Sequence, residues 1–600
     1  MEKDIIKIGN AGGFWGDDLS ALKRQVTGGE LDYITSDYLA EITMGILMKQ
    51  KMKDENMGYV YDFLSQLDEI IEIVISKGIK IITNAGGMNP SALALRIKEM
   101  GNRKGLSFKV AAIDGDDIFH RIDSIYPEKE ELKNMETGLN FSEVRDKLLS
   151  ANVYLGVQPV LRALENGADI IVTGRVTDTA ITLAPMIHEF GWKLNDWDKL
   201  ASGVIGGHII ECGSQSTGGN FTDWKEVKQW ENIGFPILEV SRDGTFIVTK
   251  HEDTGGIVSG NSVKEQLLYE MGDPKEYLSP DVIADFTSIQ LEDEGHNRVR
   301  IKGIKGKPPT HFLKVSASYL EGYKASGSIL VGGFHVTKKS KIFKDIFWKK
   351  VGIDFEKKET ELLCTKDSED YNKTILRFSV YDRDKSKIVK FGKEISTLIL
   401  SGPAGAAVTG GRPDPRTVIG YWPALIRKEL IDSRIKVCKT GSDDIEEIKV
   451  PSLTGLEVDY RDHGEHDELL SSGEPGEPVK NGRKVFLKDI CLARSGDKGD
   501  TSNIGVIAKN EIIYECIKKY LTPDKVKKMF RRVCNGKVIR YEVKNLLAFN
   551  FLLEESLGGG GAKSVFIDAQ GKLYAQELLS NYLEVDEDCY KKIEKSLEID

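Results

Sequence analysis

Four short apolar runs recur in the first third of the chain, and each ends in a polar loop rich in Gly, Asn or Asp. Each run holds four to six residues, which suits a buried strand and is too short for a helix. Helical patterns usually follow, and this alternation predicts an α/β fold whose N-terminal sheet is largely parallel and doubly wound. The runs and their loops are Ile5–Ile8 before GNAGGFWGDD, Ile79–Thr83 before NAGGMNP, Phe108–Ile113 before DGDD, and Asp169–Thr173 before GRVTDTA.

These four loops are expected to share one edge of the sheet. In a parallel sheet the carboxyl ends of all strands lie at the same edge, and ligands bind there, above all where the strand order reverses. The loops carry Asn84, Asp114 and Arg175, so polar groups of three kinds should meet at this edge. We therefore expect a binding site for a negatively charged ligand there.

The rest of the chain divides into further units. The patterns predict helices over 59–78 and 152–167, and half-buried antiparallel strands over Arg298–Ile301 and Phe312–Ser318. Residues 461–484 are charged and rich in Gly and Pro, which is typical of an exposed linker. We expect an α/β region over 1–460, open to division near 260–340, then this linker, and a smaller α+β domain over 485–590.

Composition and charge narrow the classes of partner. Lys and Arg number 83 against 93 Asp and Glu, a net charge of −10, which argues against nucleic acid binding. The seven cysteines are scattered without a CxxC pair, which disfavours a disulfide framework or zinc ribbon and favours a reducing compartment. The start of the chain lacks a signal-peptide pattern, and no apolar run spans a membrane. We expect a cytoplasmic protein with a small-molecule partner and no membrane partner.

The first loop invites a dinucleotide interpretation. Gly12 and Gly13 follow a first strand, where glycines let a pyrophosphate approach the backbone. The spacing is not GxGxxG, and Asp17 and Asp18 at the next helix start would repel a phosphate. Tight-turn glycines explain the segment nearly as well, so a nicotinamide or flavin cofactor is not favoured, and Gly12 and Gly13 are retained as substrate-binding candidates.

The loop after the fourth run is a better anion site. Free N–H groups at a helix start, together with Arg175, suit a carboxylate or a phosphate. A capped helix in which Arg175 pairs with a nearby Asp is an equally good explanation. The candidate substrate-binding residues of this loop and of the second loop are Asn84, Gly86, Gly87, Gly174, Arg175, Thr177 and Asp178.

Two further segments carry groups suited to catalysis. Asp114 and Asp116 in DGDD could hold a divalent cation or a general base, although helix capping also explains such residues. In HIIECGSQSTGGN, His208, Glu211 and Cys212 offer a base, a metal ligand and a thiol, although Cys212 could equally be a small buried filler. All five are candidate catalytic residues. Asp116 and Glu211 are also candidate metal ligands, and Gly218 and Asn220 are candidate substrate contacts.

The C-terminal region adds one polar turn, ARSGDKGDTS, directly after a strand-like run. Its glycine amides could form an anion nest, and Arg494, Ser495 and Lys498 are candidate substrate-binding residues. A solvated hairpin is the alternative. His463 and His466 resemble a ligand pair, but their linker setting favours a solvated charge run.

Taken together, these motifs resemble the acyclic terpene utilisation protein A (AtuA) family. The resemblance continues through GGELDYITSDYLAEITM, GFPILEV, DTGG, LLYEMGDPKEYLSPDV and GGRPDPRTVIGYWP, and ARSGDKGDTSNIGVIA is similar to the ferredoxin-like domain that often follows. It covers nearly the whole chain. It implies the breakdown of branched acyclic isoprenoids such as citronellol and geraniol as acyl-CoA esters, but it brings no catalytic residue or cofactor.

Three functions stay open at this point. The first is an enzyme that hydrates, eliminates from or cleaves a carboxylated or CoA-linked branched intermediate, which requires oxyanion stabilisation and an acid/base pair. The second is a non-catalytic subunit that binds the intermediate and docks partner enzymes. The third is a nucleotide-dependent oxidoreductase. A divalent metal and self-association into a homo-oligomer are left open as well.

Overall fold

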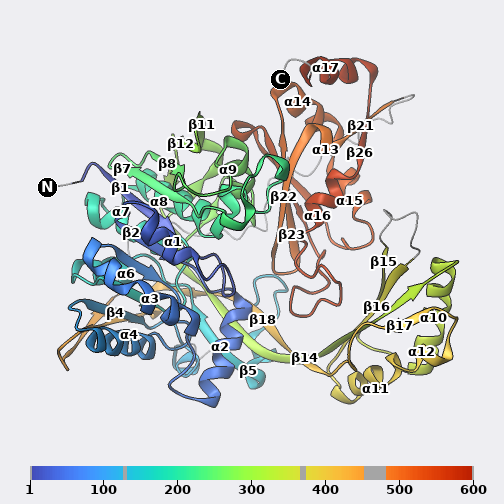
Figure 1. Cartoon of the computed structure of the whole chain (residues 1–600), viewed down its shortest axis with the longest axis horizontal. Coiled ribbons are helices and arrows are strands. Elements are labelled where there is room, and N and C mark those ends of the chain that lie inside the picture. The colour runs from blue at the N-terminus through green and yellow to red at the C-terminus, as the bar shows by residue number, and fades with distance from the viewer. Residues whose placement is uncertain (1–2, 126–131, 365–372, 452–481, 598–600) are drawn as a thin grey trace.

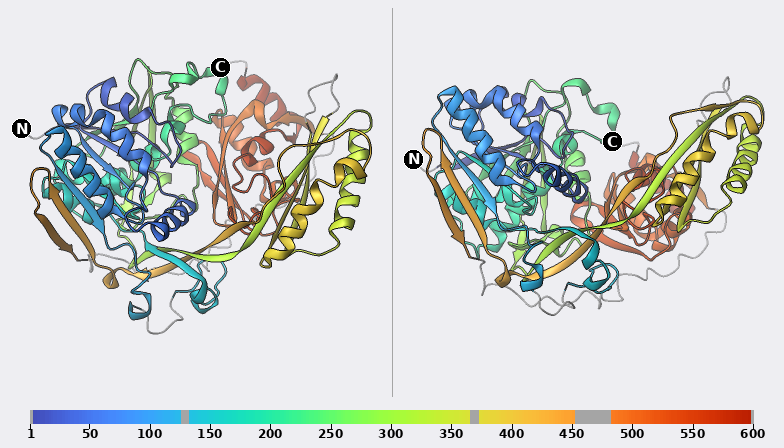
Figure 2. Two further views of the ribbon diagram at one scale, coloured as in Figure 1. Left: turned by 60° about the horizontal axis from the view of Figure 1, so that its bottom comes forward. Right: turned by 90° about the horizontal axis from the view of Figure 1, so that it is seen from below.

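The computed structural model describes residues 3–125, 132–364, 373–451 and 482–597, and the chain forms three parts (Figure 1). An N-terminal α/β body is followed by a distal lobe and then by a C-terminal domain. In both views of Figure 2 the C-terminal domain lies between the body and the lobe. The linker expected at 461–484 lies outside the described residues, apart from residues 482–484, as do His463 and His466.

The body is built on an eleven-stranded mixed sheet. Its five central strands are parallel to one another, which places the loops after β1, β3, β4 and β6 at one edge as expected. In spatial order the strands are β11 (Gln290–Gly295), β12 (Arg298–Lys302), β8 (Phe246–Thr249), β7 (Ile237–Ser241), β1 (Ile5–Asn10), β2 (Tyr33–Ser36), β3 (Lys80–Thr83), β6 (Ile170–Thr173), β4 (Lys109–Asp114), β19 (Ser433–Lys439) and β20 (Ile445–Val450).

The expectation of a largely parallel sheet is therefore not confirmed, because the flanking strands on both sides run antiparallel. A run of apolar residues reports burial on both faces, but it carries no information on strand direction. Short connections such as the one between β7 and β8 join neighbouring strands as hairpins, and a hairpin can only be antiparallel.

Helices cover both faces of the sheet, and each face has its own hydrophobic core. In β6 the side chain of Ile171 enters one core, whereas Ile170 and Val172 enter the other, as the alternation of a strand requires. One face is covered by α1 (Ala21–Gly28), α3 (Tyr61–Lys77) and α4 (Pro90–Lys104), and the other by α6 (Gln158–Glu165), α7 (Ala180–Phe190) and α8 (Trp197–Ile210). The helix expected over 59–78 is present and ends at Gly78, which has φ +68° and donates to the carbonyls of Val74 and Ile75.

The long strand β14 (Phe312–Gly332) carries the chain from the body into the distal lobe. Its first half pairs with β5 (Leu148–Val153) and β18 (Arg416–Arg427). Because β5 takes up the start of the segment expected to be helical over 152–167, helix α6 is shorter than expected. The second half of β14 belongs to the lobe with β15 (Lys357–Cys364), β16 (Lys373–Asp382), β17 (Ala406–Val408), α10 (Val336–Val351), α11 (Lys385–Ile395) and α12 (Leu398–Ser401).

The C-terminal domain is an antiparallel four-stranded sheet with helices packed against it. Its strands, in spatial order, are β22 (Cys491–Lys498), β23 (Thr501–Ala508), β25 (Ala548–Leu553) and β24 (Val538–Val543). The buried amide of Asn503 joins the domain to the body, because it donates to the carbonyl of Leu268 and accepts from the N–H of Glu270. The turn between β22 and β23 is thereby held against the body.

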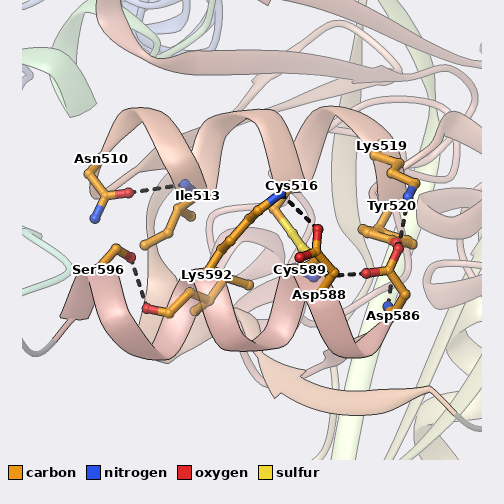
Figure 3. Close-up of a disulfide and its surroundings, with 11 residues drawn as sticks. Asn510, Ile513, Cys516, Lys519, Tyr520, Asp586, Asp588, Cys589, Lys592 and Ser596 are labelled. Carbon is orange, nitrogen blue, oxygen red and sulfur yellow. Dashed lines mark hydrogen bonds and ion pairs between the residues drawn. A yellow bond between two sulfur atoms is a disulfide. The ribbon is translucent and has the colours of Figure 1, made fainter.

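A disulfide joins two helices of this domain, α14 (Glu511–Tyr520) and α17 (Glu587–Leu597) (Figure 3). Cys516 and Cys589 are separated by 73 residues in sequence, and their Cα atoms lie 6.6 Å apart. The scattered cysteines disfavour a disulfide framework, and this single bond is a departure from that expectation. Spacing along the chain does not reveal a pairing that two distant helices create. Within the described residues, no helix is both long and apolar enough to cross a membrane.

Candidate active site

Glycines at the carboxyl edge of the sheet allow its loops to pack closely. An ideal Cβ added at Gly13 would lie 2.6 Å from the carbonyl carbon of Cys212, and one added at Gly86 would lie 2.5 Å from the carbonyl oxygen of Thr173. A side chain at Gly174 would collide with the carboxyl group of Asp116. These contacts join the first loop to the segment around Cys212, and the second and third loops to the end of β6 and its loop. The four loops lie at one edge of the sheet, as the sequence predicts.

Arg175 lies at the centre of this edge and is only 3% exposed. Its guanidinium donates to the carbonyl of Leu39 at 2.8 Å and to the carboxylate of Asp178 at 3.0 Å, and it stacks 4.1 Å from the ring centroid of Tyr154. Its Nε has no hydrogen-bond partner among the described residues. The pairing of Arg175 with Asp178 agrees with the capped-helix explanation, while the free Nε leaves a donor that an anion could use, so the anion site stays a prediction.

Two cations contact the Tyr154 ring. Lys314 of β14 stands 5.1 Å from the ring centroid that Arg175 also contacts, and the Tyr154 hydroxyl donates to Glu41 at 2.7 Å. Burial opposes ionisation of Glu41, but the positive charges of Lys314 and Arg175 outweigh it and lower the pKa of this carboxyl to about 2. Glu41 is therefore a fixed negative charge, and Lys314 is its counter-ion at 4.0 Å.

Two further carboxyl groups beside Arg175 bind protons unusually well. Burial raises the pKa of Asp37 to about 6, against the opposing effects of Arg175 and of the amide of Asn84, which donates to Asp37 at 2.5 Å. Burial among protein atoms and the negative charges of Asp37 and Glu211 also raise the pKa of Asp178, although Arg175 pulls it down. Too few cations surround these carboxyls for all of them to ionise together, so protons are shared among them.

Asp37, Glu41, Tyr154 and Lys314 are site residues that sequence reasoning did not single out. A signal for Asp37 exists, since Tyr33–Ser36 is a β-branched run ending in an acidic residue, as at the other strand ends. For Tyr154 and Lys314 there is no comparable signal. They meet only because β5 pairs with β14, whose residues lie far away in sequence.

His208, Glu211 and Cys212 lie together at the end of α8. His208 is buried, its Nδ1 lies 3.2 Å from Glu211 Oε1, and its ring packs against Tyr277 and Phe286. His208 Nε2 and Glu211 Oε2 are buried without hydrogen-bond partners among the described residues. Burial and the neighbouring negative charge of Glu211 raise the pKa of Cys212 well above its ordinary value, so a neutral thiol is expected rather than a nucleophilic thiolate.

The C-terminal domain contributes Lys498 to the same region. Its Nζ stands 5.7 Å from the ring centroid of Tyr277, a residue whose pKa is raised by burial and then by the negative charge of Glu211. Burial and the positive charge of Lys314 lower the pKa of the Lys498 amine. The predicted C-terminal turn therefore reaches the site through Lys498.

Arg494 and Ser495 in the same strand perform structural tasks. Arg494 forms a buried ion pair with Glu265 at 2.8 Å and donates to the carbonyl of Gly219 at 3.3 Å. The hydroxyl of Ser495 donates to the carbonyl of Gly571 at 2.7 Å and accepts from the N–H of Ala575 at 3.0 Å. Arg494 therefore joins the two domains, whereas Ser495 ties β22 to residues 571–575 within the C-terminal domain.

Asp114 and Asp116 occupy different positions. Asp114, on the outermost parallel strand, accepts from Ser91 at 2.7 Å and pairs with Lys436 at 3.2 Å. Asp116 is buried behind Arg175, and it accepts from the Arg175 backbone N–H at 2.9 Å and from Asn152 at 2.8 Å. Burial raises the pKa of Asp116 to about 7. Asp116 thus positions the loop of Arg175.

The donor set expected for a metal is not assembled. One carboxylate oxygen of Asp116 already accepts a hydrogen bond from the Arg175 N–H, and Glu211 already pairs with His208. Among the described residues no three His, Cys, Asp or Glu side chains are arranged to hold a metal ion. The chemistry of this site is therefore left to the protein's own side chains.

The remaining candidates shape the loops. The N–H of Gly12 donates to the side chain of Asn10, and the N–H of Gly13 donates to the carboxylate of Asp17. In the dinucleotide interpretation, the Gly13 N–H would instead have faced a pyrophosphate. Gly87 and Gly218 adopt positive φ values of +53° and +104° in crowded turns. Thr177, whose N–H donates to the carbonyl of Leu155, is half-buried beside Asp178, and Asn220 is exposed.

An apolar cavity of about 80 Å³ lies beside the cluster rather than in it. Leu155 and Leu313 line this cavity, whereas their neighbours Tyr154 and Lys314 belong to the charged cluster. Side chains of adjacent residues in extended chain point to opposite sides. The paired segments that hold Tyr154–Leu155 and Leu313–Lys314 therefore separate the apolar cavity from the charged residues around Arg175. We place the chemistry at the charged cluster because the cavity offers few ionisable groups.

The fold and the site define an α/β protein with a buried acid–base and cation cluster, completed by a hairpin from a second domain. The sequence profile described as "Acyclic terpene utilisation family protein AtuA" matches residues 6–437, and the profile of the AtuA ferredoxin-like domain matches residues 485–584. The chain belongs to the AtuA family, which is implicated in acyclic terpene utilisation. No curated protein matches the chain.

Proposed function

We propose that this protein is a lyase-type enzyme of acyclic terpene breakdown. Its substrate is a branched intermediate that bears a carboxylate or a CoA thioester, and the reaction is a hydration, an elimination or a carbon–carbon cleavage. The observation that carries the proposal is the pair formed by Arg175 and Asp178, in which a buried cation touches a carboxyl group whose raised pKa favours the protonated form. Such a pair can bind an oxyanion and donate a proton at one place.

Anion binding is supported by the two cations that contact Tyr154, Arg175 and Lys314. Arg175 is fixed by the Leu39 carbonyl and by the loop that Asp116 holds, so its guanidinium is preorganised. Lys314 is partly accessible, with 42% of its side chain exposed. Preorganised cations at the point where negative charge develops stabilise an enolate or carboxylate without reorganisation during the reaction.

Acid–base chemistry is supported by the different accessibility of the two carboxyls with raised pKa. The Asp178 side chain is 36% exposed, so substrate can reach it, whereas Asp37 is 5% exposed and contacts Asn84. We assign Asp178 as the proton donor to a leaving hydroxyl or an oxyanion. Asp37, whose pKa is about 6, adds negative charge beside Asp178 when it ionises, and this charge raises the pKa of Asp178 further.

The test is turnover by the purified full chain with branched hydroxyacyl and enoyl acids and their CoA esters. Asp178→Asn removes the proton donor and is expected to lower kcat about 10²- to 10⁴-fold. Arg175→Gln is expected to raise KM about tenfold or more, as loss of a charge-assisted hydrogen bond implies. Asp169→Asn is the matched control, because Asp169 precedes the same strand β6 at the opposite edge and its side chain is also 36% exposed.

Unchanged turnover of Asp178→Asn would overturn the assigned acid. Tight binding of an intermediate without turnover of any member of the panel would favour a non-catalytic binding subunit instead. Turnover that requires added NAD(P) or flavin, with the absorbance change of that cofactor, would favour an oxidoreductase. The thermal unfolding of each variant is measured alongside so that loss of fold is not mistaken for loss of chemistry.

A further inference from the structure

Lys498 is an amine placed in the site without a carboxylate partner. Its Nζ makes no hydrogen bond or ion pair with the described residues, and its one recorded contact is the face of the Tyr277 ring at 5.7 Å. Lys498 ends β22 at the tip of a two-stranded hairpin, where it pairs in register with Thr501. An unpaired lysine that projects from a rigid hairpin into a polar site is poised for a role other than an ion pair.

The neighbouring Lys314 differs from Lys498 because it has a carboxylate partner. Lys314 lies 4.0 Å from the Glu41 carboxylate and near the Tyr154 hydroxyl, and these groups raise its pKa despite burial. Lys314 therefore stays cationic and repels a proton from Lys498, whose own pKa is lowered by burial and by that charge. Lys498 is solvent-accessible, and a lysine that stands among protein atoms beside another cation is an arrangement that favours the neutral, nucleophilic amine.

The position of Lys498 is fixed by several contacts of the hairpin. Arg494 in the same strand is anchored to Glu265, and Asn503 in the partner strand is anchored to Leu268 and Glu270. At the turn, Gly499 has φ +64° and packs so closely on the carboxyl group of Glu136 that a side chain would collide with it. The backbone that carries Lys498 is therefore fixed before substrate arrives.

We propose that Lys498 is a covalent catalyst that forms an imine with the carbonyl carbon of an oxo acid, a ketone or aldehyde whose anionic end binds Arg175. This inference rests on the proposed function, since it uses the same site, and it narrows the substrate class to compounds that carry a ketone or aldehyde carbonyl. It also selects among the reactions proposed above, because an imine accepts the electron pair released when a neighbouring C–C or C–H bond breaks.

The chemistry balances without an added reagent. The amine lone pair forms the C–N bond while the C=O π electrons move to oxygen, which takes a proton from the protonated carboxyl of Asp178. The nitrogen then loses a proton to the ionised carboxyl of Asp178, which passes it to the hydroxyl as that group leaves as water and C=N forms as an iminium. The iminium gives its remaining N–H proton back to the Asp178 carboxylate, which leaves the neutral imine. The sum is amine plus carbonyl giving imine plus water, and hydrolysis of the product imine reverses it and regenerates the amine.

Reductive trapping of the full chain tests the inference. Levulinate, a simple oxo acid, is incubated with the protein at pH 7 in the presence of sodium cyanoborohydride, and the adduct is located by peptide mass spectrometry. We expect one adduct on Lys498, its loss in Lys498→Arg, and its retention in Lys509→Arg, which removes an exposed lysine of the same domain. Lys314→Met is expected to slow trapping at pH 7 several-fold, because the charge that lowers the Lys498 pKa is gone.

Equal labelling of Lys498 and the other lysines, or an adduct that survives Lys498→Arg, would overturn the inference. If levulinate is not trapped but Asp178→Asn abolishes turnover, the imine is wrong while the proposed acid–base function stands. If Lys498 is trapped selectively but no intermediate in the panel turns over, the imine stands and the proposed function fails. Circular dichroism of Lys498→Arg confirms that a lost adduct does not reflect a lost fold.

Discussion

At the scale of single residues, the electrostatics of this protein are set by carboxyl groups that cannot all ionise. Asp37 and Asp178 lie beside one guanidinium, while Glu41 is held ionised by Lys314. Carboxyl groups with similar intrinsic affinities for a proton thus acquire different protonation behaviour from their surroundings. The same reasoning applies to Asp116, whose buried carboxyl accepts from the Arg175 backbone N–H and from Asn152.

The pH dependence of stability should reveal Asp116. Burial raises its pKa to about 7 in the folded chain, against about 4 when unfolded. Below about pH 4 both states keep the proton, and between about pH 4 and 7 only the unfolded state loses it. Stability therefore falls as pH rises through this window, by on the order of 4 kcal/mol from this group, and levels off above it.

Asp116→Asn should flatten that slope in urea unfolding measured from pH 4 to 8, because Asn also accepts from the Arg175 N–H. Asn152→Ala removes a hydrogen bond to the ionised form and should extend the loss of stability to higher pH. An Asp116→Asn slope identical to that of the unmodified chain would contradict the assignment.

At the scale of elements, the hairpin β22–β23 depends on one buried ion pair. Arg494 and Glu265 are 2% and 0% exposed, and each keeps further hydrogen bonds, Arg494 to Gly219 and Glu265 to the Thr222 N–H. Replacing Arg494 by Met leaves a buried carboxylate unpaired and is expected to cost about 3–5 kcal/mol of unfolding free energy. Urea unfolding measures this cost.

The double variant Glu265→Met with Arg494→Met should recover much of that loss, because no charge remains unpaired. The exposed pair Asp588–Lys592, at 2.7 Å within α17, provides the control. Lys592→Met is expected to change the unfolding free energy by less than about 1 kcal/mol. An equal cost at both sites would show that burial does not govern the Arg494 pair.

The disulfide between α14 and α17 is the second interaction that stabilises the elements of the C-terminal domain. Closing a loop of 73 residues restricts the unfolded chain, so Cys589→Ser should lower the unfolding free energy of the C-terminal domain by about 2–4 kcal/mol. Reductant should produce the same loss in the unmodified chain and no further loss in Cys589→Ser. Cys534→Ser, which removes a free buried cysteine, should still respond to reductant.

At the scale of the whole molecule, the site joins two domains. Asp37, Arg175 and Asp178 come from the body, whereas Lys498 comes from the C-terminal domain. Asn503 and Asn550 seal the interface, with the Asn550 amide donating to the carbonyls of Met271 and Gly272. Substrate binding should therefore order both sides of the interface together.

Hydrogen–deuterium exchange measures this coupling. Millimolar levulinate is expected to slow amide exchange both in residues 37–41 of the body and in residues 496–503 of the C-terminal hairpin. The edge strands β11 and β12 should not change, and they serve as the internal control. Protection confined to one domain would contradict a shared site.

Much of the parallel core could be predicted from sequence because burial on both faces leaves apolar runs. The strands at Ile5–Ile8 and Asp169–Thr173 could be predicted for this reason. The sheet edge that holds both Asn84 and Arg175 could be predicted from them as well. The antiparallel flanks could not be predicted, since their half-buried patterns do not encode which strand lies alongside. The family, implied by the ordered motifs, is confirmed by the profile matches.

What the sequence determined by itself is local: strand ends that place polar groups at one edge, and glycines that allow close approach. What only the tertiary structure decided is which polar groups meet. Tyr154 joins Lys314 through a strand pairing across more than a hundred residues, and Lys498 reaches Tyr277 through domain docking. Their ionisation depends on burial and neighbouring charge, and neither quantity exists until the chain is folded.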